Sequence, residues 1–281
     1  MPGLLAFHAH PDDESISMGG TMAKAADAGE QVVVVSCTRG EVGQIYNRDD
    51  ADEIRPTLGV VREAELADAC RILGITGYEF LGYRDSGMMG TDDNDHPDSF
   101  WRADFMEAVG RAVAHIRSYT PEVVTAYDAY GGYGHPDHIN THRIGTAAFY
   151  GAADVGRFPA EEYGDPWQPM KLYWTTWPRS RARLARQRAV AAGEMTPEEA
   201  AVEPPFGTPD AHITTWVDVR EQVERKFAAI LAHDTQIAAD SWFRTLDEAD
   251  RLEGFGRETF VRVSASVVTP DTETDLFAGL R

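Results

Sequence analysis

The stretch that decides the fold is Leu4-Leu5-Ala6-Phe7-His8-Ala9-His10-Pro11-Asp12-Asp13-Glu14. Its first four residues form an apolar run typical of a short buried strand, and its last residues lead into a helix that ends near Gly29. Between strand and helix, the turn combines imidazoles with carboxylates. Parallel α/β sheets bind their ligands at the carboxyl ends of the strands. The stretch therefore predicts the first strand of such a sheet, with a polar site at its end.

A second cluster of the same chemistry follows another apolar run. The run is Val123-Val124-Thr125-Ala126-Tyr127, and the cluster is Gly131-Gly132-Tyr133-Gly134-His135-Pro136-Asp137-His138. Pro136 suits the first turn of a helix, because its missing N–H has no intrahelical partner there. Both clusters thus lie where a strand turns into a helix. We interpret them as two halves of one metal site.

The rest of the chain predicts an α/β fold: a Rossmann-like, mainly parallel sheet with helices on both faces, plus a smaller C-terminal α+β portion packed on it. Four consecutive valines in segment 31–36 indicate a buried strand, and right-handed crossovers bring the strand ends to one rim. Further strands are predicted at 78–81, 121–127, 171–177, 214–217 and 260–263. Further helices are predicted at 60–73, 105–119, 136–153, 179–192 and 220–231. Segments 49–56, 158–169 and 203–209 are predicted to be loops, and the polar C-terminal tail is uninformative about structure.

One domain is predicted for residues 1–281, with a core at 1–155 and a C-terminal portion, 156–281, that completes the substrate pocket. The formal net charge of −20 argues against nucleic acid or a membrane surface as a partner, because such a field repels phosphate. No leader or membrane-spanning run is recognised. Cys37 and Cys70 are expected to be buried, reduced thiols, which favours a cytoplasmic protein. A homo-oligomer is left open.

His10, Asp13 and His138 form the predicted metal-ligand set. Zinc favours imidazole nitrogen and carboxylate oxygen, and a catalytic zinc site has three protein ligands and one open position. Asp12 is then not needed as a ligand and can serve as the general base for a water molecule. His142, one helical turn after His138, is the alternative ligand.

The remaining polar side chains of the second cluster are expected to support the reaction. His135 is close enough to point at a substrate oxygen, and Asp137 could fix the tautomer of His135 or of another histidine.

Together, Ala9-His10-Pro11-Asp12-Asp13-Glu14 and His135-Pro136-Asp137-His138 resemble the two motifs of the zinc-dependent N-deacetylases that include the GlcNAc-phosphatidylinositol de-N-acetylases, often called the LmbE-like family. The resemblance covers the first 150 residues. It extends more loosely through Lys171-Leu172-Tyr173-Trp174 and His233-Asp234-Thr235-Gln236, which resemble segments of the actinobacterial mycothiol enzymes. That branch contains the GlcNAc-inositol deacetylase and the mycothiol S-conjugate amidase.

The resemblance implies a role for each matched residue. It implies Zn²⁺, with Fe²⁺ as the alternative metal, and it supports the same three ligands and the same base. It further implies that His135 stabilises the oxyanion, that Asp137 orients a histidine and that Tyr133 assists at the carbonyl oxygen.

Three residues are matched to substrate contacts in the same way. Arg62 and Asp85 correspond to sugar- or inositol-binding positions, although a surface ion pair and an ordinary turn are the simpler explanations. Ser17 stands where the amidases carry a lysine, which favours the deacetylase. The ending Thr274-Asp275-Leu276-Phe277-Ala278-Gly279 looks more like the amidases.

The predicted reaction is hydrolysis of the amide of an N-acetyl amino sugar, with GlcNAc-inositol as the first candidate. The alternatives are hydrolysis of a thiol conjugate by an S-conjugate amidase and deacetylation of another acetamido sugar or antibiotic intermediate. A phosphoesterase would need a second metal or a cluster of cations, and only Arg39 and Arg84 lie near the motifs. A metal-stabilised carbohydrate-binding module would leave Asp12 and His135 without a role.

Overall fold

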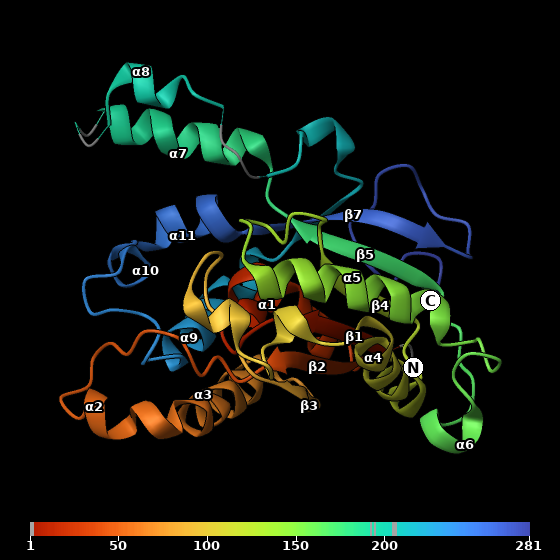
Figure 1. Cartoon of the computed structure of the whole chain (residues 1–281). Helices are drawn as coiled ribbons and strands as arrows, with labels where there is room; N and C mark the ends of the chain where they lie inside the picture. Colours follow the sequence, from red (N-terminus) through yellow and green to blue (C-terminus); the bar gives the residue numbers. More distant parts are fainter. Residues whose placement is uncertain (1–2, 192, 194, 204–206) are drawn as a thin grey trace.

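Seven strands form a single sheet in the computed structural model, which describes residues 3–191, 193, 195–203 and 207–281 (Figure 1). The strands are β1 Gly3–His8, β2 Gln31–Thr38, β3 Gly77–Tyr83, β4 Val123–Tyr127, β5 Lys171–Thr176, β6 Thr215–Asp218 and β7 Arg257–Ala265. Their order is β3-β2-β1-β4-β5-β7-β6. The first five run parallel, and β7 pairs antiparallel with both β5 and β6. The predicted α/β fold class is therefore confirmed.

The longer helices are α1 Asp13–Asp27, α3 Leu58–Leu73, α4 Phe105–Tyr119, α5 Pro136–Gly151, α7 Arg179–Ala191, α9 Val223–Ala232 and α11 Glu248–Phe255. Shorter ones are α2 Ala51–Ile54, α6 Ala160–Tyr163, α8 Pro197–Ala200 and α10 Trp242–Thr245. Helices α2 and α6 correct the prediction of loops at 49–56 and 158–169, since single helical turns are too short to show an apolar period. Residue 192 of the predicted helix and residues 204–206 of the predicted loop lie outside the described residues.

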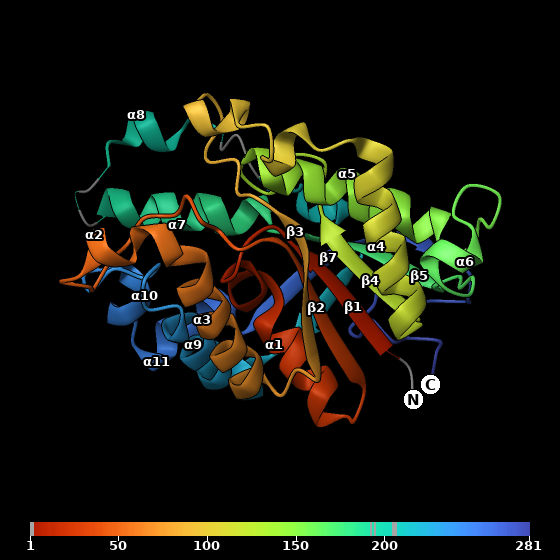
Figure 2. The same ribbon diagram turned by 60° about the horizontal axis from the view of Figure 1, so that its bottom comes forward.

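Helices cover both faces of the sheet because its central strands are apolar on both sides. In β1, Leu5 and Phe7 pack with α4 and α5, whereas Leu4 and Ala6 face α1, α3 and α9. Side chains alternate between the faces of a strand, so a continuous apolar run buries both faces. Figure 2 shows the sheet between these two groups of helices. The hairpin of α7 and α8 stands away from the sheet (Figure 1).

The polar C-terminal tail, about which the sequence was uninformative, is part of the core. Glu273 is fully buried, and its carboxylate accepts hydrogen bonds from Lys171 Nζ at 2.6 Å and from the Tyr173 hydroxyl at 2.7 Å. Leu276 and Phe277 pack into the apolar cluster on the α1 side of the sheet. The hydropathy of the tail does not indicate this role, because the residue that anchors the tail is charged and is buried with a partner inside the protein.

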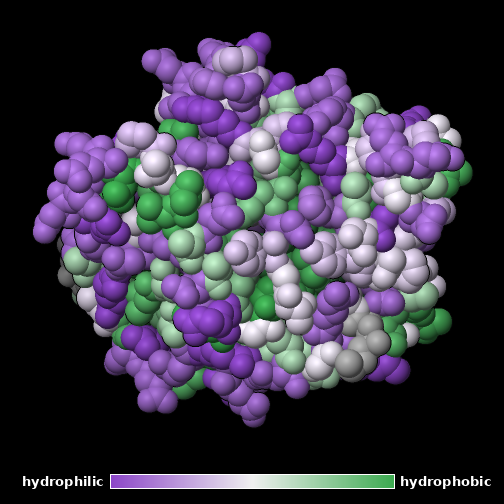
Figure 3. Space-filling view, turned by 90° about the horizontal axis from the view of Figure 1, so that it is seen from below, coloured by the Kyte–Doolittle hydropathy of each residue, from purple (hydrophilic) through white to green (hydrophobic). Residues whose placement is uncertain are grey.

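One face of the molecule is mainly hydrophilic (Figure 3). Hydrophilic residues cover most of the face in Figure 3, with smaller hydrophobic groups between them. No helix within the described residues is long and apolar enough to cross a membrane. Both cysteines are buried and unbonded, as predicted.

The topology brings the two clusters together. Strand β1 lies between β2 and β4, and the order of the strands along the chain reverses there. A doubly wound sheet binds its ligands at such a point, outside the carboxyl ends of the strands. The turn after β1 and the start of α5 after β4 meet at this point, which places the first cluster against the second.

Candidate metal centre and active site

Three side chains form a triangle of donor atoms at the end of β1. Oδ2 of Asp13 lies 3.3 Å from Nδ1 of His10 and 3.2 Å from Nε2 of His138. Zinc bonds of about 2.0–2.1 Å place tetrahedral donors roughly 3.3–3.4 Å apart. The two imidazoles are buried, and the carboxylate is partly exposed. The donor set and its spacing therefore fit a metal ion with one side open.

The other nitrogen of His10 contacts a second carboxylate. Nε2 lies 3.2 Å from Oδ2 of Asp137, which also accepts the backbone N–H of Ser86 at 2.9 Å. The Ser86 hydroxyl contacts the other Asp137 oxygen. Such a carboxylate fixes the tautomer and ring orientation of a ligating histidine. Of the two partners considered for Asp137 from the sequence, the structure thus gives His10 and not the side chain of His135.

Burial and charge act in opposite directions on His10. Burial favours the neutral imidazole, but Asp85, Asp13 and Asp137 together raise the pKa of His10 well above its ordinary value. A bound metal needs the neutral form, so a metal ion competes with a proton for this side chain.

Asp85 is buried, not part of an exposed turn. Its carboxylate lies 3.6 Å from His10 Nε2 and accepts the backbone N–H of Gly87 at 2.8 Å. The segment 82–90 therefore contributes to the site through a fixed carboxylate.

Asp12 adopts an unusual backbone conformation, with φ 116° and ψ −33°. Burial raises the pKa of its carboxyl to about 6, although the nearby Arg62 guanidinium opposes this shift. Arg62 itself is only 3 % exposed, and it contacts Asp12 and the carbonyl oxygens of Pro11 and Gly40. The simpler explanation of Arg62 as a surface ion pair is therefore wrong.

His135 is held as a neutral donor. Its Nδ1 accepts the backbone N–H of Asp137 at 3.1 Å, so its proton resides on Nε2. Burial and the neighbouring His10 lower the pKa of His135 to about 3. Tyr133 is half exposed, and its hydroxyl lies 3.4 Å from His138 Nε2. Ser17 turns its hydroxyl back to the carbonyl oxygen of Asp13 in α1.

Comparison with known proteins identifies the family. Residues 5–149, more than half of the chain, match the family model described as "GlcNAc-PI de-N-acetylase". The chain belongs to this family. Its resemblance to the family, predicted from the two motifs, is confirmed.

Two relatives in the family align along almost the whole chain. A 1D-myo-inositol 2-acetamido-2-deoxy-alpha-D-glucopyranoside deacetylase from Geodermatophilus obscurus is 43 % identical, with 99 % of this chain and 97 % of the relative aligned. A protein of the same name from Acidothermus cellulolyticus is 44 % identical, with 99 % and 94 % aligned. These relatives are deacetylases, hydrolases that act on amides, which is the class of enzyme predicted from the sequence.

Solved structures show the same fold. The N,N'-diacetylchitobiose deacetylase from Pyrococcus horikoshii has a TM-score of 0.62 and 20 % identity, and the match covers 93 % of this chain and 84 % of that one. This similarity in fold extends beyond residue 149, where the match to the family model ends.

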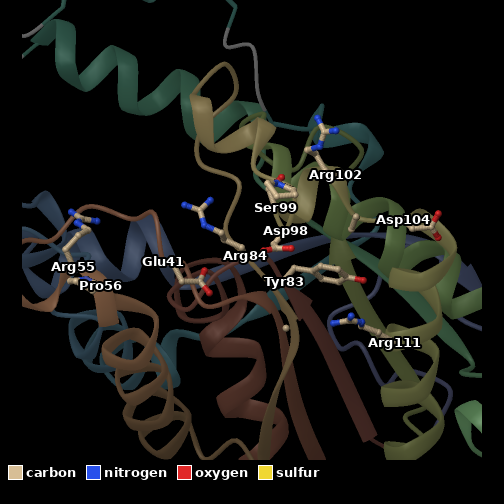
Figure 4. Close-up of a pocket in the computed structure, with 13 residues that line it drawn as sticks. Glu41, Arg55, Pro56, Tyr83, Arg84, Asp98, Ser99, Arg102, Asp104 and Arg111 are labelled. Carbon is tan, nitrogen blue, oxygen red and sulfur yellow. The ribbon is translucent and has the colours of Figure 1, made fainter.

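A cavity of about 850 Å³ is lined by Gly82, Tyr83 and Arg84 of the 82–90 segment and by Glu41, whose carboxylate accepts the Asp85 N–H at 3.1 Å (Figure 4). Among the described residues that line it, none is a predicted metal ligand, although Arg84 directly precedes Asp85. The cavity is lined by four arginines, Arg55, Arg84, Arg102 and Arg111. Three of them already pair with carboxylates, and Arg55 contacts the carbonyl oxygen of Gly43. These cations are therefore engaged within the protein, which does not favour the phosphoesterase alternative.

Sequence reasoning missed two supports of the site. The ring of Tyr127 stacks on His138, with centroids 4.4 Å apart and an interplanar angle of 12°. Glu14 pairs with His233, far along the chain. Tyr127 ends an apolar strand and Glu14 belongs to the first motif, so their positions in the sequence indicated that they lie near the site. The sequence did not indicate which side chains they contact. His142, the alternative ligand, instead contacts the Tyr127 carbonyl oxygen at 2.9 Å.

Proposed function

We propose that this protein hydrolyses the N-acetyl amide of a small amino-sugar substrate, with GlcNAc-inositol as the first candidate. The observation that carries the proposal is the donor triangle of His10, Asp13 and His138, whose 3.2–3.3 Å spacings suit a catalytic metal with an open position. The names of the family relatives support the choice of substrate.

The proposed metal is Zn²⁺, held by the same three side chains, with Fe²⁺ as the alternative. When bound, the metal supplies Lewis acidity to the attacking water and to the acyl oxygen. Asp137 holds His10 in the required orientation from behind. The identity of the metal is open to direct measurement in the purified protein.

Asp12 is the proposed general base. A pKa of about 6 leaves its carboxylate ionised at neutral pH and still basic enough to take a proton from water. The contact with Arg62 holds this carboxylate in place, because the guanidinium is itself fixed by backbone carbonyl oxygens. After attack, the proton can pass from Asp12 to the departing amine.

His135 and Tyr133 are the proposed stabilisers of the developing oxyanion. The Nε2–H of neutral His135 is free to donate, since its Nδ1 accepts a backbone N–H. One preorganised donor of this kind typically contributes about 10²–10³ in rate. The Tyr133 hydroxyl, beside His138, can donate to the same acyl oxygen.

Arg62, Asp85 and Ser17 remain proposed substrate contacts. Asp85 has one oxygen near His10, and it borders the site from the 82–90 segment. The C-terminal portion, 156–281, is proposed to complete the pocket, because Asn47 in the loop after β2 hydrogen-bonds to the carbonyl oxygens of Asp234 and Ile237. A cytoplasmic location and a homo-oligomer remain predictions.

The test is to incubate zinc-loaded protein with GlcNAc-inositol and, in parallel, with a mycothiol S-conjugate. Free amine is measured with and without a chelator. Chelator-sensitive amine from GlcNAc-inositol supports the proposal, and amine from the S-conjugate alone supports the amidase. No amine from either substrate contradicts both assignments.

A further inference from the structure

A buried carboxylate–imidazole pair lies directly behind the proposed base. Oε1 of Glu14 lies 2.8 Å from Nε2 of His233, and both side chains are fully buried. His233 is the C-cap residue that directly follows α9, so it comes from the C-terminal portion of the chain. The pair therefore joins the first motif to a segment 219 positions later.

The second oxygen of Glu14 acts on the backbone of Asp12. Oε2 accepts the Asp12 N–H at 2.9 Å, while Oε1 also accepts the hydroxyl of Ser15 at 2.6 Å. His233 and Ser15 thus fix the rotamer of Glu14, and the fixed carboxylate holds the Asp12 amide. A change at His233 reaches the proposed base through a single intervening side chain.

The conformation of Asp12 needs such support. Its φ of 116° lies in a region that L-residues rarely adopt. Strained residues of this kind persist where their surroundings over-determine them, and they occur preferentially at active sites. Arg62 restrains the Asp12 side chain at 3.2 Å, but the Glu14 contact restrains its backbone N–H.

We propose that Glu14 and His233 are positioning residues for Asp12, an inference that rests on the proposed function. His233 fixes the Glu14 carboxylate, which in turn holds the Asp12 backbone so that the side chain faces the open side of the metal site. Misplacement of a reacting group by about 1 Å can cost roughly 10²-fold in rate.

The opposing explanation is that the pair only fastens α9 to α1. The chain offers a matched control for this explanation two residues away. The Thr235 hydroxyl donates to Glu65 Oε2 at 2.8 Å, and the Thr235 N–H donates to Oε1 at 2.7 Å. This contact fastens the same C-terminal loop to α3 without touching Asp12. Thr235→Val removes the hydroxyl contact while keeping the shape of the side chain.

The kinetic test compares Glu14→Ala, Glu14→Gln, His233→Leu and Thr235→Val, all zinc-loaded. Glu14→Ala and His233→Leu are expected to lower kcat about 10²-fold, with KM within about twofold and an unchanged metal-to-protein ratio. Glu14→Gln, which keeps an acceptor oxygen, should recover most of the rate, and Thr235→Val should retain the parental rate. Equal losses in all variants, or losses only in metal content, would overturn the proposal.

A second measurement separates this inference from the proposed function. Amide hydrogen exchange of Asp12, followed by NMR, requires no turnover. We expect a protected Asp12 amide in the parent and in Thr235→Val, and faster exchange in Glu14→Ala and His233→Leu. Unchanged exchange in these two variants refutes the positioning role even in an active enzyme. Protection of Asp12 in a parent protein that releases no amine would instead refute the proposed function alone.

Discussion

Arg62 Nη2 lies 3.2 Å from Oδ2 of Asp12, and both side chains are largely withdrawn from water. The same guanidinium donates to the carbonyl oxygens of Pro11 and Gly40. One arginine on α3 therefore braces two loops at the rim of the sheet and restrains the proposed base. These contacts depend on the planar, forked shape of the guanidinium group as well as on its positive charge.

Arg62→Lys keeps the charge but cannot reproduce the fork. We expect kcat to fall about 10²-fold, because the Asp12 carboxylate loses its position. Steady-state kinetics on the N-acetyl sugar measure this effect. Arg71→Lys, on the exposed part of the same helix, is the control and should leave kcat unchanged. A rise in KM with unchanged kcat would contradict the role of Arg62 in holding Asp12 and leave only its proposed substrate contact.

Asp12→Asn removes the proposed base while keeping its size. The variant should lose about 10²–10⁴ in kcat, the usual contribution of a general base. Because Asp12 is not in the donor triangle, bound zinc per protein should stay at the parental value. Elemental analysis and amine release on the same sample provide the check. A variant that turns over near the parental rate would remove Asp12 from the mechanism.

Asp137→Asn tests the carboxylate behind His10. Loss of this contact should weaken metal binding about 10–100-fold, because the imidazole is no longer held in one tautomer and orientation. Competition against a chromogenic chelator measures the affinity. His142→Gln, on the same helix but in contact with the Tyr127 carbonyl oxygen, should bind metal normally. A weaker metal affinity in His142→Gln would restore His142 as a ligand.

Glu273→Gln tests the buried anchor of the C-terminal tail. The substitution leaves the Lys171 ammonium buried without its counter-charge, which should lower the free energy of unfolding by about 3 kcal/mol. Asp275→Asn is the control, because the Asp275–Arg281 pair is solvent-exposed and should contribute less than about 1 kcal/mol. Urea denaturation of the parent and the two variants measures these free energies of unfolding. Equal midpoints would contradict the role of Glu273 as the anchor of the tail.

The pair of His233 and Glu14 predicts a pH-dependent stability. Burial disfavours a charged imidazole, but the Glu14 carboxylate outweighs burial and raises the pKa of His233 above 6.5. On the His233 side, the stabilisation is therefore fully present below pH 6.5 and is lost as the pH rises through the raised pKa of the folded state. The free energy of unfolding, measured in urea, should differ most between the parent and His233→Gln near pH 6 and differ less at pH 9. A difference that grows with pH would contradict this sign.

Short sequence patterns predicted the order of strands and helices and the two halves of the site, since each of these features depends on a few neighbouring residues. The apolar run before His10 marks a strand buried on both faces, and right-handed crossovers bring His138 to the same rim. The burial of Arg62 was harder to predict, because a charged residue on a helix is usually exposed. Only the tertiary structure shows the carbonyl oxygens whose hydrogen bonds offset the cost of burying its guanidinium. The partners of Glu14 and Lys171 lie 219 and 102 positions away, and no local pattern encodes such pairs.

The separation of Lys171 and Glu273 along the sequence also means that one is synthesised well before the other. At typical elongation rates of about 5–20 residues per second, the ribosome needs roughly 5–20 s to make the 102 positions between them. Throughout this interval the growing chain already contains both metal-binding motifs, but β5 still carries an ammonium group without its counter-charge. The nascent chain therefore contains all three proposed metal ligands well before it contains the carboxylate that neutralises the buried Lys171 ammonium.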